Sequence, residues 1–253
     1  MISFGKRSLG TLRRRPIDVM DDVFHKSEWM ETGTDPYPAL SPTVFLAEQP
    51  PDCALLPHFH RQNQFQLFVD GAGSIGKEPL RPVTVHYAGA YTGYGPILSG
   101  PEGLKYFTIR SSFDTGLIWA DEAREKMVRG PKRHAQASVG APWSVERLSV
   151  LDGVHHETAI APSAGLGAEL SCLPPRADAA LPPIEGSVGQ FVFVLAGTAL
   201  LNGATLEPWE SAFVPATDGV ARITAGAGGA EIIALHMPQT AAEYVTREET
   251  FAS

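Results

Sequence analysis

Short runs in which apolar and polar positions alternate, separated by glycine and proline, extend along most of the chain. The clearest run is Gln64–Val69, where phenylalanine, leucine and valine take every second position. Alternation with a period of two predicts a β-strand with two different faces. The next four residues, Asp70–Gly73, predict a turn that ends this strand.

The pattern of Gln64–Gly71 is repeated at Gln190–Gly197, again as a glutamine, an apolar strand and a glycine at the same distance. Two later segments, Pro208–Pro215 and Glu231–His236, continue the likeness as a strand that leads to a proline and a closing strand. A repeat of this length predicts two domains of the same architecture.

We expect the two domains to be residues 1–135 and 136–253, with a boundary near 130–142. A short helix is predicted before it, at 119–129, because the acidic residues of this segment come early and the basic ones late. Val145–Val150 predicts the first strand after it. The 25 glycines and 21 prolines fall between β-rich runs, so the sequence predicts an all-β protein with little helix.

Two histidines separated by one residue, His58 and His60, are the strongest chemical signal. Alternate side chains of a strand point to the same face, so both imidazoles can reach one point, as in a metal site. Gln64 is expected to return on the neighbouring strand and face them. The alternative is a pair of polar residues on the solvent face of an edge strand.

The stretch Pro57–Gly71, PHFHRQNQFQLFVDG, resembles the first signature of the cupin superfamily. That signature has two histidines one residue apart, an acidic residue and then a glycine, and here Gln64 takes the acidic position. An amide oxygen is a neutral ligand, so metal affinity should fall. The resemblance implies two tandem cupin (jelly-roll type) barrels with one short helix between them.

The second cupin signature resembles Gly89–Pro96, with one residue more than expected. The resemblance then places Pro101 where the third histidine would be, so this imidazole is missing. His86 is a candidate replacement, because the β-branched run 82–87 predicts a strand with Thr84 and His86 on one face. His86 is otherwise an ordinary histidine of the sheet.

The candidate metal ligands are therefore His58, His60, Gln64 and His86. Gln64 could equally satisfy a buried backbone amide. The resemblance to cupins implies a divalent transition metal at the mouth of the barrel, with Fe(II) favoured and Mn, Ni, Cu or Zn as alternatives.

Tyrosines near the predicted site supply phenol hydroxyls, and Tyr94 and Tyr106 are the candidates for an acid or hydrogen-bond donor. Such an aromatic wall suits a flat or partly apolar organic molecule. Lys105, Arg110 and Arg81 could bind a carboxylate of this molecule, or could be surface charges.

The second domain is expected to have no metal site. The positions equivalent to His58 and His60 are Ile184 and Gly186, and Val220 takes the third, so none can ligate a metal. We expect this barrel to be degenerate and to serve packing, dimerisation or the shaping of the first site.

The formal net charge of −8 argues against a general nucleic-acid-binding protein, which needs a concentrated basic surface. No stretch approaches the roughly 20 apolar residues of a membrane span, and no signal core follows the basic residues near the start, so we expect a cytoplasmic protein. Cys53 and Cys172 are too few for a disulfide framework and are expected to be buried.

The leading functional prediction is a metal-dependent cupin enzyme that acts on a small, aromatic or carboxylated organic molecule, as a dioxygenase-type oxidoreductase. Two histidines that leave open positions on a metal permit O₂ to coordinate, whereas the missing carboxylate weakens the match. The alternative is a non-catalytic cupin that binds or senses a small molecule. The expected partner is this small molecule, with no nucleic acid or membrane, and a homodimer remains open.

Overall fold

The computed structural model describes residues 1–35 and 37–248, which form two compact units. The first barrel, as we call one unit, contains Gly10–Gly140 and the segment that begins at Thr240. The second barrel contains Met1–Leu9 and Ala141–Gln239. The chain passes from the first barrel to the second between Gly140 and Ala141, and each end of the chain belongs to the unit formed by the other half.

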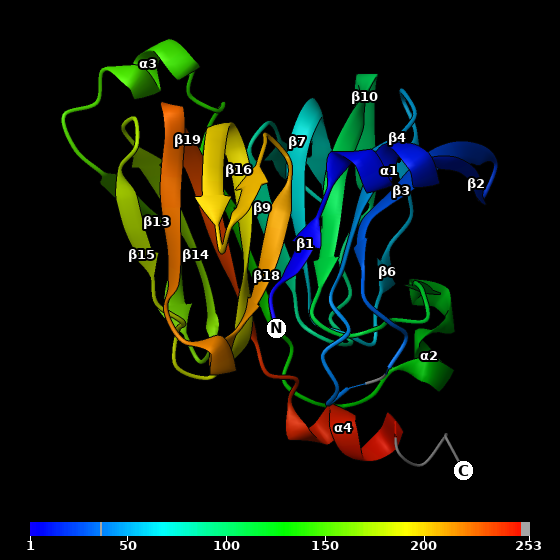
Figure 1. Cartoon of the computed structure of the whole chain (residues 1–253). Coiled ribbons are helices and arrows are strands. Elements are labelled where there is room, and N and C mark those ends of the chain that lie inside the picture. The colour runs from blue at the N-terminus through cyan, green and yellow to red at the C-terminus, as the bar shows by residue number, and fades with distance from the viewer. Residues whose placement is uncertain (36, 249–253) are drawn as a thin grey trace. The chain divides into compact units, whose positions relative to one another are not determined.

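The first barrel is built on a nine-stranded sheet in which all pairs are antiparallel (Figure 1). Its main path has the order β12-β9-β7-β10-β4-β3-β2, while β5 pairs with β10 and β8 with β7. A separate two-stranded sheet joins β6 to β11. The bounds are β2 Arg15–Val19, β3 Asp22–Glu31, β4 Thr43–Gln49, β5 Ala54–Leu55, β6 His58–Phe59, β7 Gln64–Ile75, β8 Glu78–Leu80, β9 Thr84–Ala88, β10 Ile97–Arg110, β11 Ile118–Trp119 and β12 His134–Ser138.

The register of the central strands places polar side chains together. Gln66 of β7 lies directly opposite His86 of β9 on one side and Thr108 of β10 on the other. Directly opposite residues of a sheet share a face, so these polar groups, with Gln64 two residues earlier, line one face. The strand at 82–87 and its facing pair Thr84 and His86 are confirmed, since Thr84 lies opposite Phe68 on the same face.

The second barrel repeats this arrangement in an eight-stranded antiparallel sheet with the main order β1-β18-β16-β19-β14-β13. Short strands β15 and β17 pair with β19 and β16. Its bounds are β1 Ser3–Gly5, β13 His155–Ser163, β14 Leu166–Leu173, β15 Asp178–Leu181, β16 Ser187–Leu201, β17 Ala204–Leu206, β18 Ser211–Pro215 and β19 Ala221–Pro238. Its core is aliphatic, with Val192, Val194 and Ile232 fully buried.

The helices are short, but the described residues contain more of them than the single helix predicted at 119–129, where Trp119 belongs to β11 and only Ala120–Lys126 is helical. They are α1 Arg7–Arg13, α2 Ala123–Lys126 preceded by the 3-10 turn Ala120–Glu122, α3 Val145–Ser149, the 3-10 turn Ala216–Asp218 and α4 Ala242–Glu248. None of the described helices is long and apolar enough to cross a membrane. Both cysteines are buried and free, as expected.

One predicted strand is wrong, because Val145–Ser149 forms helix α3. The Ser144 side chain accepts a hydrogen bond from the Arg147 backbone N–H and caps the helix. Leu148 then points into the core at no exposure. A run this short is compatible with the residue period of a strand and with that of a helix, and the Ser144 cap stabilises the helix.

The predicted turn at Asp70–Gly73 is also wrong, because β7 continues to Ile75. Gly71 has a φ of +79°, and the ladder to β10 is irregular here. A Cβ on Gly71 would lie 2.2 Å from the Gly103 carbonyl oxygen. The glycine therefore allows two strands to approach closely at a bulge, where the sequence pattern indicates a chain reversal.

Substitution Gly71→Ala should lower the free energy of unfolding by about 2 kcal/mol or more, because the new methyl group meets backbone and the left-handed conformation disfavours any side chain. Urea denaturation monitored by circular dichroism measures the loss. Gly153→Ala is the control, since its Cβ would meet nothing within 4 Å. Equal stability of the two variants would contradict the close approach of the strands.

Candidate functional site

His58 lies at the start of β6 and is 2% exposed. Its Nδ1 lies 2.7 Å from the Leu56 carbonyl oxygen, which can only accept, so Nδ1 is the protonated nitrogen. Nε2 then accepts a hydrogen bond from the Tyr94 hydroxyl at 2.9 Å. A β-bridge between His58 and Tyr94 holds the two backbones together, so the position of the phenol is set by the sheet.

His60 is anchored by a carboxylate. Its Nδ1 donates to Asp114 Oδ1 at 2.9 Å, and Asp114 also accepts from the backbone amides of Arg61, Gln62 and Gly116. Arg110 Nη2 contacts the same ring, 3.1 Å from Nδ1 and 3.3 Å from Nε2, and because Nδ1 carries the proton that Asp114 accepts, Nε2 is the atom that can accept from Arg110. The Asp114 side chain has no exposure at all, so this is a buried charge pair bridged by an imidazole.

Gln64 connects these groups. Its Oε1 accepts hydrogen bonds from Arg110 Nε and Nη2 at 3.1 and 2.8 Å, and its Nε2 donates to the Tyr94 hydroxyl at 2.5 Å. Side chains, and not a backbone amide, therefore satisfy Gln64. Because the Gln64 amide donates to the Tyr94 oxygen, the Tyr94 hydroxyl proton remains available for donation to His58 Nε2. The donor and acceptor roles of the three side chains are therefore consistent.

His86 lies on the same polar face, in β9, and is fully buried. Its Nδ1 donates to Gln66 Oε1 at 2.8 Å. Within the described part of the chain its Nε2 has no hydrogen-bond partner. The ring centroid lies 5.0 Å from that of Tyr94, which is in turn 4.5 Å from His58. The phenol therefore lies beside both imidazoles.

Burial keeps the three histidines neutral. Burial, assisted by the neighbouring His60, lowers the pKa of His58 to about 3, and burial assisted by His134 lowers the pKa of His86 to about 3. Burial and Arg110 also lower the pKa of His60. At neutral pH each ring therefore has a lone pair on Nε2.

The other titratable groups keep their ordinary charge. Burial raises the pKa of Tyr94, so its hydroxyl stays protonated. Burial also acts to raise the pKa of Asp114, but Arg110 and His60 act more strongly together and lower it, so the carboxylate stays charged.

Sequence reasoning missed part of this site. Asp114 follows β10 in an irregular segment with no motif, and Arg110 looked like a surface charge as readily as a site residue, although it is 6% exposed. Tyr106 is not joined to the histidines by any hydrogen bond of the described residues. It packs against Phe68, with ring centroids 5.0 Å apart, within the apolar part of the same barrel.

The donor chemistry fits a transition metal. Ligating histidines commonly donate Nδ1–H to a carbonyl or carboxylate and present Nε2 to the metal, and His58, His60 and His86 each have Nδ1 bound in this way. The unpartnered Nε2 of His86 is the clearest sign. No three His, Cys, Asp or Glu side chains of the described residues lie close enough together to hold a metal as they stand.

No protein-family model and no curated protein sequence matches the chain. Solved structures do resemble it. The bacterial pirin YhhW of Escherichia coli in complex with nickel(II) has a TM-score of 0.58 at 12% identity, and covers 95% of this chain and 100% of its own. A putative dioxygenase of Nostoc punctiforme has a TM-score of 0.58 at 12% identity, and covers 96% of this chain and 81% of its own.

Pumpkin seed globulin has the same TM-score of 0.58 at 13% identity, over 89% of this chain and 84% of its own. All three are two-barrel cupins. The all-β, two-barrel cupin fold predicted from the sequence is therefore confirmed. Identities this low show a shared fold and do not show a shared function, because proteins with different functions adopt the same fold.

Substitution Asp114→Asn should lower the free energy of unfolding by about 3 kcal/mol, because it leaves the buried Arg110 charge uncompensated. Asp70→Asn is the control, since its pair with Lys105 is exposed and is worth less than about 1 kcal/mol. Chemical denaturation of both variants measures the difference. A loss at Asp114 no larger than at Asp70 would show that the buried pair does not stabilise the barrel.

Proposed function

We propose that this two-barrel cupin binds a divalent transition metal in its first barrel through His58, His60 and His86, and that the metal site acts on a small organic molecule. The observation on which this rests is the shared state of the three imidazoles, which are buried, neutral, and anchored through Nδ1. Nε2 of His86 has no partner among the described residues, while Nε2 of His58 and of His60 accepts from Tyr94 and Arg110, hydrogen bonds that a bound metal would replace.

Gln64 is assigned a positioning role in this proposal. Its oxygen accepts two hydrogen bonds from Arg110 and could reach a metal only after giving them up. Arg110 and Asp114 instead fix His60, and Gln64 fixes Tyr94, so these residues orient the groups that face the ligand.

When bound, the metal would supply Lewis acidity and a site where substrate and O₂ can coordinate. Tyr94 supplies a proton donor. Its hydroxyl is held by Gln64 and its raised pKa keeps it protonated, so it can turn from His58 Nε2 toward an oxygen of a bound molecule. The phenol thus acts as a hydrogen-bond donor and not as a base.

The walls near His58 favour an aromatic molecule over a carboxylated one. Trp119 lies edge-on to the His58 ring with centroids 6.2 Å apart, and Tyr94 lies 4.5 Å away. Arg110 is already bound to Gln64, His60 and Asp114 and is not available to a substrate carboxylate. A dioxygenase-type oxidation is the reaction class we propose, as the Nostoc punctiforme neighbour carries that description.

The purified protein, reconstituted anaerobically with Fe(II), Mn(II), Ni(II), Cu(II) or Zn(II), should hold about one equivalent of metal per chain. His58→Ala with His86→Ala should reduce it to about a tenth or less, because two of three ligands are lost. Inductively coupled plasma mass spectrometry measures the content, and His155→Ala, an exposed histidine of the second barrel, should leave it unchanged. Equal metal in all variants would overturn the assignment.

A metal-free binding protein is the second candidate, and the closed hydrogen-bond network favours it. His58, Tyr94, Gln64, Arg110 and His60 satisfy one another without any metal. In that case a panel of hydroxylated aromatic compounds would bind with the same affinity before and after a chelator removes metal from the protein, as measured by calorimetry. Under the metal proposal, binding depends on the metal and Fe(II)-loaded protein consumes O₂ with at least one member of the panel.

A further inference from the structure

The second barrel retains a buried polar pair where the first has Gln64 and Arg110. Gln190 of β16 and His236 of β19 lie directly opposite each other and follow Gln64 and Arg110 at the same offset along the chain. Both are 1% exposed. Because directly opposite side chains share a face, both lie on the face that holds Val192 and Ile232, which is the aliphatic core of this barrel.

Hydrogen-bonding capacity at this pair is unused. Neither ring nitrogen of His236 has a hydrogen-bond partner among the described residues. Gln190 Nε2 donates to the Leu181 carbonyl at 2.8 Å, but Gln190 Oε1 has no partner in the same part of the chain. Buried polar atoms in folded proteins nearly always have a hydrogen-bond partner, so a ligand or water is expected there.

A carboxylate stands beside them. Glu169 of β14 places Oε2 3.8 Å from His236 Nε2, beyond hydrogen-bond length, and has no Lys or Arg partner in the described chain. Burial lowers the pKa of His236 to about 4, so the ring is neutral at pH 7 and supplies one acceptor and one donor. The site therefore offers three acceptors, one donor and a net negative charge.

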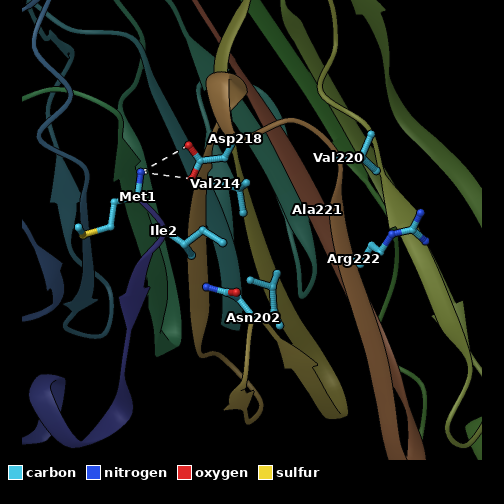
Figure 2. A pocket seen from close by; sticks show the side chains of 9 residues that line it. Met1, Ile2, Asn202, Val214, Asp218, Val220, Ala221 and Arg222 are labelled. Carbon is cyan, nitrogen blue, oxygen red and sulfur yellow. Dashed lines mark hydrogen bonds and ion pairs between the residues drawn. The ribbon is translucent and has the colours of Figure 1, made fainter.

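A hollow of about 600 Å³ opens in the same barrel (Figure 2). Gln190, His236 and Glu169 do not line it, but two of its lining residues are sheet neighbours of Gln190 and of Leu181. Val214, which lines it, is the strand partner of Gln190. Ala221, which also lines it, pairs with Leu181, whose carbonyl accepts from Gln190. Figure 2 shows Asp218 already bound to the Met1 amine, so this carboxylate has its own cation and Glu169 does not.

We propose that the second barrel has its own ligand site at Gln190, His236 and Glu169, and that it takes a small primary ammonium compound with an oxygen atom close to the nitrogen. Three N–H donors match the three acceptors, and the oxygen accepts from the His236 N–H.

The test uses the full chain labelled with ¹⁵N-histidine and ethanolammonium chloride as the probe at pH 7. The ring signals of His236, assigned by their loss in His236→Gln, should shift saturably. Glu169→Gln keeps the shape of the side chain at a partly exposed position. It should raise the dissociation constant about tenfold or more, since it removes a charge-assisted hydrogen bond. Glu157→Gln, on the opposite face of the same pair of strands, should leave it unchanged.

Sodium acetate and propan-1-ol should produce no saturable shift, because one has the wrong charge and the other has too few donors. Failure of ethanolammonium to shift the His236 signals, equal shifts with propan-1-ol, or an unchanged affinity in Glu169→Gln would each overturn the proposal and leave buried water as the occupant. The shift should persist in His58→Ala/His86→Ala, so the result is independent of the proposed metal site.

Discussion

The buried guanidinium of Arg110 is the charge on which the interior of the first barrel depends. An uncompensated cation at 6% exposure would be very costly, so the Asp114 carboxylate and the Gln64 oxygen must stay in place. These partners in turn fix His60 through Nδ1 and the Tyr94 hydroxyl through the Gln64 amide. One electrostatic requirement thus orients most of the polar face.

The two barrels share a geometric requirement as well. Gly71 meets Gly103 in the first barrel, and Gly197 meets Gly229 in the second, where a Cβ would lie 2.1 Å from the carbonyl oxygen. The close approach of long strands is therefore a property of the repeated unit. The chemistry differs because His236 takes the place of Arg110: the guanidinium joins Gln64 and His60 in the first barrel, whereas both ring nitrogens of His236 have no hydrogen-bond partner among the described residues.

The sequence predicts the fold well, because strand alternation and the repeat of Gln64–Gly71 at Gln190–Gly197 are local patterns. It also predicts that Thr84 and His86 share a face. It fails where one signal has two meanings: Asp70–Gly73 predicts a turn but forms a bulge, and Val145–Val150 predicts a strand but contains a capped helix. Asp114 was missed because its partner His60 is distant in sequence, and only folding brings them together.

The state of the three imidazoles is the central claim, and long-range ¹H–¹⁵N correlation of the histidine rings tests it most directly. At pH 7 and without metal, His58, His60 and His86 should each be neutral, with the proton on Nδ1, and added Zn(II) should shift their Nε2 signals. The opposite tautomer, a charged ring, or Nε2 signals indifferent to Zn(II) would contradict the account.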